Sequence, residues 1–223
     1  YKFFDYCFLH SQMVTQCALD AGLKNVQYMP YGFDKDEYFP IKTRKKFNIS
    51  FAGSPQTNSD PEDDDRVKTI NALKDFKVKV FGSKFKKLVK PGIKVYSCDT
   101  HEAMNKAFNQ SKINLNIPLI NSELPEFKNK YHPKNRFYEI PGSGNFMLCG
   151  YDDEANEQFE SGKHCAYYDS FNLNELCERV EYYLTHEEER EEIARAGYEH
   201  AVANHQTIFR FRDMMNTIEE KFF

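Results

Sequence analysis

The sequence lacks tryptophan, any Cys-x-x-Cys pair and any long apolar run. A membrane-spanning helix needs about 20 mostly apolar residues, and no stretch of the chain approaches that length. The chain does not open with a basic segment followed by an apolar one, so no secretory signal is predicted. These absences favour a cytoplasmic protein.

The six cysteines show neither the regular spacing of a disulfide framework nor a ligand-like spacing with histidine. Cys149 ends the apolar run 146–149, where a free thiol behaves as a small buried hydrophobe. We therefore expect all six to be reduced core residues in a reducing compartment. The cysteine pattern predicts no metal site.

An excess of charge of one sign is also missing. The 30 basic and 34 acidic residues are interspersed and give a net charge of -4. A general nucleic-acid-binding protein would show a basic face, so no nucleic-acid binding is expected. The acidic run 60–65 is interpreted as a solvated loop in preference to a metal site, because adjacent carboxylates in a flexible loop rarely preorganise one.

Short β-rich runs alternate with helical stretches along most of the chain. Six predicted strands follow residue 47, enough for one doubly wound, Rossmann-like parallel α/β sheet. These strands are 48–52, 77–81, 93–96, 112–117, 145–149 and 164–168. The predicted helices are 65–74, 101–109, 133–140, 172–184, 186–204 and 207–221, with Asn172 or Asn174 capping the fourth and a Thr185–Glu188 capping box starting the fifth.

The first 46 residues break this rhythm. Residues 1–28 contain a predicted strand, helix and strand (6–10, 11–21 and 26–29), too little to bury a core alone. A Pro- and Gly-rich segment follows and is interpreted as an interdomain connection. The chain begins without Met, as a piece of a longer protein would. The last helix is apolar around more than half its circumference and needs partners on two sides, as a helix bridging two domains would have.

Two glycine turns follow predicted strands. Gly53-Ser54 ends the first strand after residue 47, and Gly82-Ser83 ends the next. Ligands of open α/β sheets bind beyond the carboxyl ends of the strands, where glycine lets the backbone approach an anion closely. A ligand role and a plain strand-ending role both remain open for Gly53 and Ser54.

The most informative block begins at the predicted helix after residue 132. Pro133 suits a first helical turn, and the amides near Asn135 favour an anion, with Lys134 or Arg136 adding charge. Glu139, one turn later, is placed to accept both vicinal hydroxyls of a ribose while the helix start holds a diphosphate. The alternative is that Arg136 and Glu139 simply pair on the helix surface.

The same block ends in a glycine-rich turn. The predicted helix must end by Pro141, and Gly142 and Gly144 then carry the chain into an apolar strand. A phosphate-binding helix start, a ribose-binding acid and a close-packed glycine turn together describe a nucleotide-diphosphate site.

The residues from Asn135 to Leu148 resemble the R-x-(F/Y)-E-x-x-x-x-G segment of group 1 (family-4-like) glycosyltransferases, and are most similar to their spore-maturation-protein-like branch. Residues 205–212 resemble the closing H-T-x-x-x-R of that branch, and residues 29–40 resemble the linker between the two halves of such enzymes. Further similar segments are 48–54, 158–164 and 193–197.

The resemblance implies the C-terminal, donor-binding domain of the GT-B fold over residues 47–223. Residues 1–46 would then be a remnant of the N-terminal acceptor domain plus the linker, with the last helix bridging back. The implied activity is transfer of a sugar from a nucleotide diphosphate donor, with Glu139 holding the ribose and Gly53 and Ser54 facing the donor phosphates or the cleft. Such enzymes generally need no metal or other cofactor, because helix dipole and basic residues offset the leaving-group charge.

Some features depart from the family pattern. The family's second carboxylate, eight residues before the ribose acid, is Tyr131 here. No catalytic base is named, because the acceptor domain that normally carries it is almost entirely absent; a missing N-terminal domain or partner chain is expected. For His10 a structural role is preferred to one facing the cleft, and for His132 to a phosphate contact. A catalytically silent nucleotide- or sugar-binding module in a larger assembly is the alternative function. A flavodoxin-like or receiver domain fits the sheet but not the linker or the helical tail.

Overall fold

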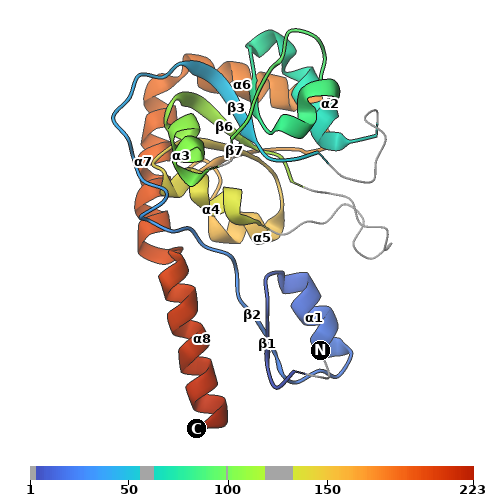
Figure 1. The fold of residues 1–223 in the computed structure, drawn as a ribbon, viewed down its shortest axis with the longest axis vertical. Helices are drawn as coiled ribbons and strands as arrows, with labels where there is room; N and C mark the ends of the chain where they lie inside the picture. Colours follow the sequence, from blue (N-terminus) through green and yellow to red (C-terminus); the bar gives the residue numbers. More distant parts are fainter. Residues whose placement is uncertain (1–3, 56–62, 99, 119–132) are drawn as a thin grey trace.

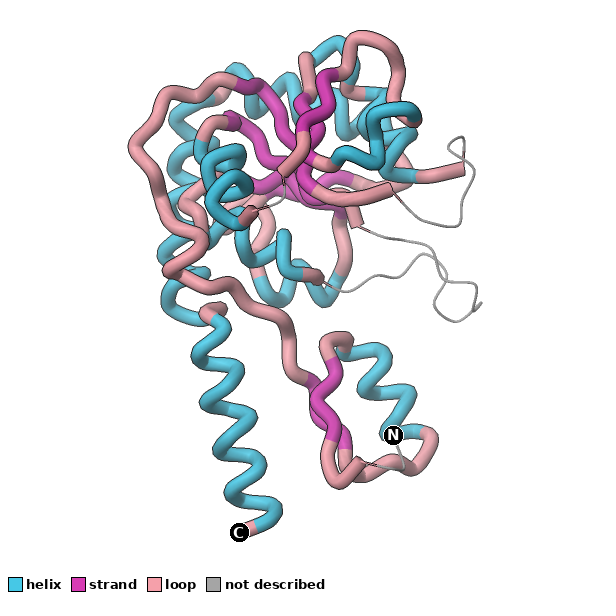
Figure 2. The backbone as a smooth tube through the Cα atoms, in the orientation of Figure 1, coloured by secondary structure: helices cyan, strands magenta, loops and turns pink. Residues whose placement is uncertain are grey.

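A computed structural model of the protein describes residues 4–55, 63–98, 100–118 and 133–223. Its main feature is a six-stranded sheet with the order β5-β4-β3-β6-β7-β8, in which every neighbouring pair is parallel (Figures 1 and 2). This is the doubly wound 3-2-1-4-5-6 order, so the predicted Rossmann-like α/β fold is confirmed. The strands are β3 (Phe47–Ala52), β4 (Lys79–Phe81), β5 (Lys94–Tyr96), β6 (Ser111–Asn116), β7 (Met147–Gly150) and β8 (Ala166–Tyr168).

Helices cover both faces of this sheet. One hydrophobic cluster joins α2 and α6 to the strands, and a second joins α3, α4 and α5 to the opposite face. In β7, Leu148 belongs to the first cluster and Met147 and Cys149 to the second, because side chains alternate along a strand. The helices are α2 (Asp65–Ala72), α3 (His101–Asn109), α4 (Asn135–Gly142), α5 (Asp153–Gln158), α6 (Leu173–Thr185) and α7 (Glu187–Asn204), with short 3-10 turns at Lys74–Phe76 and Ser83–Lys87.

A small parallel unit precedes the large sheet. It consists of β1 (Cys7–Leu9), α1 (Gln12–Asp20) and β2 (Val26–Tyr28), which confirms the predicted strand, helix and strand. In Figure 1 the small unit lies below the large sheet. The linker between β2 and β3 passes the carboxyl end of α4, where Phe33 contacts Gly142, before it reaches β3. Hydrogen bonds of Gln12 and Tyr28 join the small unit to α5. Glu154 accepts from the Gln12 amide (3.1 Å) and from the Tyr28 hydroxyl (3.0 Å), Glu157 accepts from the Gln12 side chain (2.9 Å), and Gln158 donates to the Tyr28 hydroxyl (3.2 Å).

Helix α4 differs from its prediction at both ends. It begins at Asn135 because Lys134 is extended, so Pro133 lies outside the first turn. It runs through Pro141 to Gly142, where an earlier end was predicted. A proline near the carboxyl end removes one amide donor, but Ser143 N still donates to the Glu139 carbonyl (2.9 Å) and closes the last turn.

Of the two caps predicted for α6 and α7, one is confirmed and one is wrong. Asn172 caps α6 by accepting from the Glu175 amide (3.1 Å), as predicted. The predicted capping box at Thr185 is wrong. The Thr185 hydroxyl donates to the carbonyls of Glu181 (3.1 Å) and Tyr182 (2.8 Å), so this residue ends α6 and His186 stands before α7.

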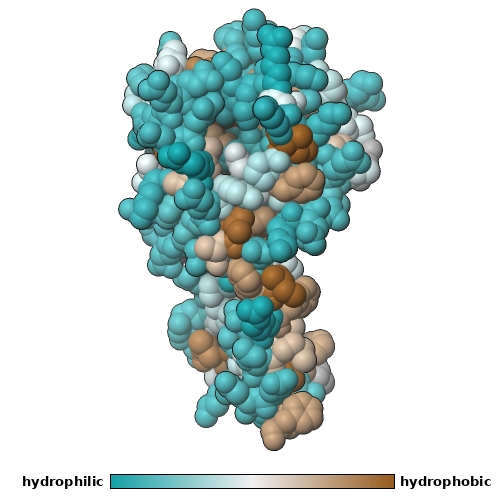
Figure 3. Space-filling view, turned by 90° about the vertical axis from the view of Figure 1, so that its left-hand side faces the viewer, coloured by the Kyte–Doolittle hydropathy of each residue, from teal (hydrophilic) through white to brown (hydrophobic). Residues whose placement is uncertain are grey.

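The last helix, α8 (Thr207–Phe222), extends beyond the large sheet and has no buried residue (Figure 1). On one side it contacts the small unit and the linker. Thr217 donates to the Gln27 side chain (3.2 Å), and Arg210 donates to the Tyr31 carbonyl (3.3 Å). Figure 3, which views the molecule from the side of α8, shows hydrophobic residues along its lower half.

All six cysteines are free thiols. Cys149 and Cys165 are buried, but Cys17 is exposed on α1, so the expectation that every cysteine is a core residue is wrong at this position. The reason is that α1 buries only one narrow face, at Thr15 and Ala18. Within the described ranges, no helix has the length and apolar character needed to cross a membrane.

Candidate functional site

The strand order of the large sheet reverses between β3 and β6. The chain leaves β3 toward α2 on one face and leaves β6 toward α4 on the other. Sheets of this order form their ligand crevice beyond the carboxyl ends of these two strands, and we call this position the crevice. Gly53 and Ser54 follow β3 at this crevice, and Ile117 follows β6. Sheets of this kind bind their ligands at such a point.

The two predicted glycine turns pack against each other. The Gly53 amide donates to the Phe81 carbonyl (3.1 Å), and the Gly53 carbonyl lies 2.0 Å from the position that a Cβ on Gly82 would occupy. Residue 82 therefore has no room for a side chain. The structure gives Gly53 this packing role, and its predicted contact with donor phosphates stays a prediction.

Arg66, in the first turn of α2, fastens the two sides of the crevice together. Its guanidinium donates to the Ser54 carbonyl (2.7 Å) after β3 and twice to the Ile117 carbonyl (3.2 and 3.0 Å) after β6. Burial lowers the pKa of Arg66 to about 10, against the opposing charge of Asp64. No sequence motif marks this residue, because its partners lie 12 and 51 positions away.

The amino end of α4 lies near the same point. Lys134 and Asn135 are exposed there, as a ligand-binding helix start requires. Partial burial lowers the pKa of Lys134, and the positive charge of Arg66 lowers it further. Two cations that repel each other beside the amino end of a helix form a place where an anion would be stabilised.

Glu139 lies on the next turn of α4 and is only 4% exposed. Its carboxylate pairs with the Arg136 guanidinium, so the pairing considered as an alternative is present, although it is buried and not on the helix surface. Tyr38 of the linker faces the same carboxylate: burial, and then the Glu139 charge, raise the pKa of its hydroxyl. Glu139 thus joins α4 to the linker, and its ribose contact stays a prediction.

Gly142 and Gly144 lie at the other end of α4, at the amino edge of the sheet. A Cβ on Gly142 would lie 2.3 Å from the Phe33 ring, and one on Gly144 would lie 2.7 Å from the Pro40 ring. Gly144 also has a φ of 73°, which favours glycine. Both glycines therefore let the linker pack closely on the domain.

Buried polar atoms without a partner in the described part of the chain mark further candidates. They are Arg136 Nε and the hydroxyls of Tyr138, Tyr168 and Ser170. Tyr168 ends β8 and Ser170 follows it, so these two lie at the same carboxyl edge as the crevice. Sequence reasoning missed both, since neither belongs to a recognisable motif.

Of the two histidines considered in the sequence, only His10 lies within the described residues. The His10 ring bonds the Met29 carbonyl (2.7 Å) and stacks on Tyr31 at 4.0 Å between centroids, which is a structural role. His132 and Tyr131 lie outside the described residues. No group of three metal-ligating side chains is found in residues 4–55, 63–98, 100–118 and 133–223.

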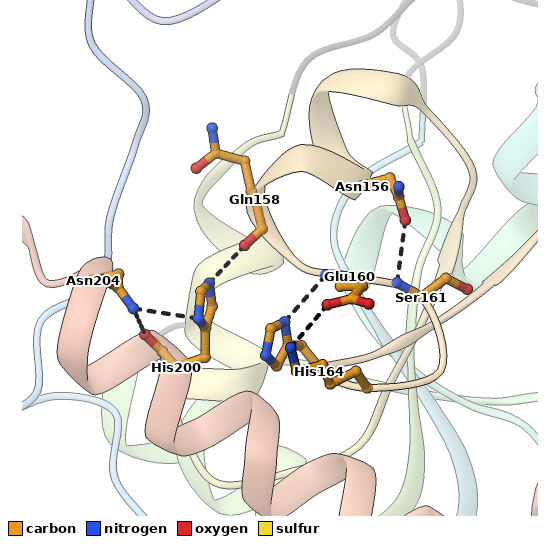
Figure 4. A network of polar contacts seen from close by, with 8 residues as sticks. Asn156, Gln158, Glu160, Ser161, His164, His200 and Asn204 are labelled. Atoms are coloured by element: carbon orange, nitrogen blue, oxygen red, sulfur yellow. Dashed lines mark hydrogen bonds and ion pairs between the residues drawn. The ribbon is translucent and has the colours of Figure 1, made fainter.

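A second polar cluster, away from the crevice, joins the segment after α5 to α7 (Figure 4). His164 and His200 stack with 4.1 Å between ring centroids, and His200 also contacts the Gln158 carbonyl (2.8 Å). His205 extends this cluster, 3.2 Å from His200 and 2.8 Å from Arg210. His205 lies between the end of α7 and the start of α8 and is buried.

The chain belongs to the glycosyl transferase-like family, whose model matches residues 65–216. No relative among the curated proteins matches the sequence at a significant level.

Solved structures share the fold at low sequence identity. HepE from Anabaena, in complex with UDP-glucose, is 11% identical with a TM-score of 0.75 over 98% of this chain and 65% of that one. Sucrose-phosphate synthase from Thermosynechococcus elongatus is 9% identical with a TM-score of 0.72 over 96% and 58%. The C-terminal domain of LpcC from Francisella tularensis, a group 1 glycosyl transferase, is 12% identical with a TM-score of 0.57 over 79% and 100%. The fold is thus that of GT-B glycosyltransferases, and the chain spans less than two thirds of HepE and of the synthase.

Proposed function

We propose that residues 47–223 bind the nucleotide diphosphate sugar of a glycosyltransferase and present it for transfer to an acceptor. The supporting observation is the pair of cations, Arg66 and Lys134, beside the exposed start of α4 at the strand-order reversal. A diphosphate placed there would receive helix amides and Lys134, while Gly53 and Ser54 face it from β3. The UDP-glucose bound by HepE is in accord with this donor class.

Glu139 is proposed to hold the ribose after a change of partner. Arg136 occupies its carboxylate in the structure, while the Arg136 side chain is 34% exposed and its Nε has no partner within the described ranges. A diphosphate at the helix start would attract Arg136 and leave the carboxylate free for hydroxyl donors. Charged hydrogen bonds of this kind each contribute about 1.5–3 kcal/mol.

Calorimetric titration of the chain with UDP, GDP, ADP and their sugars tests the donor site. We expect binding that requires the diphosphate, and Lys134→Ala and Glu139→Gln each to weaken it by about 1–3 kcal/mol. Lys106→Ala, a similarly exposed lysine on α3, is the control and should bind as the wild type does. If no diphosphate binds, the proposal is wrong. If binding survives both substitutions, Lys134 and Glu139 do not belong to the site.

Residues 1–46 are proposed to be the end of the acceptor domain and the linker, with α8 bridging back to it. The two hydrogen bonds from α8 to Gln27 and Tyr31 support this arrangement.

The branch of the family is proposed to be the family-4-like, spore-maturation-protein-like one, because residues 135–148 and 205–212 resemble its segments. We further propose a cytoplasmic, metal-independent enzyme, since Arg66, Lys134 and the helix start offset the leaving-group charge. Donor turnover that persists in EDTA would support metal independence, and a loss restored by Mg²⁺ would contradict it.

A silent binding module is the second candidate, because the chain covers only 58% and 65% of the enzymes quoted above. Binding alone does not separate the two functions. Release of free sugar or of glycosylated product from a nucleotide sugar does, when the chain is assayed together with the protein sequence that precedes it. Turnover would exclude the silent module, and tight binding without turnover would exclude the transferase.

A further inference from the structure

A cavity lies at the amino edge of the sheet, opposite the edge at which the crevice is placed. It has a volume of about 320 Å³, at the lower end of the range for small-molecule sites. Lys45 comes just before β3, Lys112 lies at the start of β6, and Asn145 comes just before β7. Since all strands are parallel, these positions are at their amino ends, and α7 closes the other side. We call this cavity the basic pocket.

The basic pocket gathers more positive charge than its own residues neutralise. Lys45, Lys112, Arg190 and Arg195 line it, against one acidic lining residue, Glu191. The side chains of Lys112 and Arg195 form no hydrogen bond or ion pair with another described residue. Like charges gathered in a partly enclosed space destabilise a protein unless an anion joins them.

Two of the cations are held in place by the fold. Arg190 is 2% exposed and donates to the Tyr183 carbonyl at 2.6 Å, which fixes its guanidinium at the end of α6. Its ion pair with Glu187 is looser, at 3.4 Å. Lys45 donates to the Asn145 side chain at 2.7 Å. A site with its cations already positioned loses little freedom when an anion binds.

The charge state of Lys45 reflects these surroundings. Burial lowers the pKa of Lys45 to about 8, and the positive charge of Arg190 adds to this effect. Lys45 is therefore partly uncharged in slightly alkaline solution. An anion between the two cations would raise this pKa and draw a proton onto the amine.

The remaining wall is apolar and includes Phe146, Ala194 and Tyr198. Such a wall suits the body of a small organic molecule whose anionic end meets the cations. A phosphate group matches the four cations better than a carboxylate does, because it carries more charge and more acceptor oxygens.

We propose that the basic pocket binds the phosphate group of a small phosphorylated molecule, at a site separate from the nucleotide-sugar crevice. Because Lys45 belongs to the linker segment and Arg195 to α7, the ligand would join the linker to the domain. Occupancy would thereby influence the linker on which the preceding unit is mounted.

Calorimetric titration with inorganic phosphate, glucose 6-phosphate and glucose tests the proposal. We expect phosphate-dependent binding in wild type, and binding at least about tenfold weaker in Lys45→Gln and Arg195→Gln, since a charged hydrogen bond is lost. Tighter binding of glucose 6-phosphate would assign the site to a phosphomonoester, and equal binding would assign it to free phosphate. Failure of both to bind, or binding equal to that of glucose, would overturn the proposal.

Three controls separate this site from the crevice and from misfolding. Lys106→Gln, with the same charge change outside the pocket, should bind like wild type. Lys134→Gln should also bind phosphate like wild type. Loss of phosphate binding in that variant would place the phosphate in the crevice and overturn the proposal. Titrations near pH 8 in buffers of different ionisation enthalpy should show proton uptake in wild type and none in Lys45→Gln. Equal uptake in both would contradict the role of Lys45.

Discussion

Arg66 donates two hydrogen bonds to the carbonyl of Ile117 and so ties the end of β6 to the start of α2. The third bond of the same guanidinium, to Ser54, includes β3 in this arrangement. One guanidinium therefore bridges the segments that follow the two central strands.

Substitution of Arg66 is expected to loosen the crevice. Arg66→Ala should lower the free energy of unfolding by about 2–3 kcal/mol, because it leaves two carbonyls without their charged donor. Arg66→Lys should lower the free energy of unfolding by a smaller amount, because one ammonium can replace only part of the hydrogen bonding of the planar guanidinium fork. Urea unfolding followed by circular dichroism measures the change.

Lys68→Ala on the same helix is the control. Lys68 is exposed and makes only a 3.5 Å ion pair with Asp65, so its loss should cost less than about 0.5 kcal/mol. Equal losses for the two positions would mean that Arg66 does not fasten the crevice.

The sheet could be predicted from the sequence because its strands are short apolar runs between polar turns. β7 is buried along its whole length and stands out as an apolar run, whereas β3 and β6 alternate apolar with polar residues, some of them buried. Helix ends were harder. At Thr185 the same side chain satisfies either a following amide or a preceding carbonyl, and only the packing of α6 and α7 decides between them.

The candidate site was predictable only in part. The helix itself follows from local sequence, although it begins at Asn135 and not at Pro133, and the exposure of Lys134 and Asn135 is observed. The role of Arg66 depends on residues brought together by the parallel sheet, and no local pattern shows this. Local sequence predicts Gly142 and Gly144 at a nucleotide site, whereas their contacts with Phe33 and Pro40 arise from a linker about a hundred residues earlier.

The contact of Gly142 with Phe33 predicts an unusual response to alanine. In a helix, Gly→Ala ordinarily stabilises by up to about 1 kcal/mol. Here the new methyl group would meet three atoms of the Phe33 ring at 2.3 to 2.6 Å, so overpacking by about 1–3 kcal/mol should prevail. Thermal and urea unfolding of Gly142→Ala should show a net loss of stability.

A double substitution identifies the cause. Gly142→Ala combined with Phe33→Leu should be less destabilised than the sum of the two single variants, since the smaller side chain relieves the clash. Strict additivity would show that Phe33 is not what opposes a side chain at position 142.

The exposed face of α8 predicts self-association. Ile208, Phe211, Met215 and Phe222 are each about half exposed and follow one another at steps of three, four and seven, so they form one apolar stripe. The double variant Phe211→Gln/Met215→Gln should lower the fraction of dimer in sedimentation velocity and leave stability unchanged. Phe209→Gln, on the half-buried side of the helix, should instead lower stability. A wild type that remains monomeric at high concentration would contradict this prediction.

His205 should make the stability of the protein depend on pH. Burial, followed by the charge of Arg210 and His200, lowers the pKa of His205 from 6.5 to about 3. Above pH 6.5 the imidazole is neutral in both folded and unfolded chains, so its full contribution is present. Between pH 6.5 and 3 only the unfolded chain takes up this proton, so the free energy of unfolding should fall by about 1.4 kcal/mol per pH unit on this account. Urea unfolding from pH 5 to 8 measures the slope of the free energy of unfolding against pH. In His205→Gln this slope should be smaller than in wild type by the contribution of one proton. In His186→Gln, which replaces an exposed histidine, the slope should equal that of wild type. Equal slopes in all three proteins would place the pH dependence elsewhere, for example with His164, whose pKa burial also lowers.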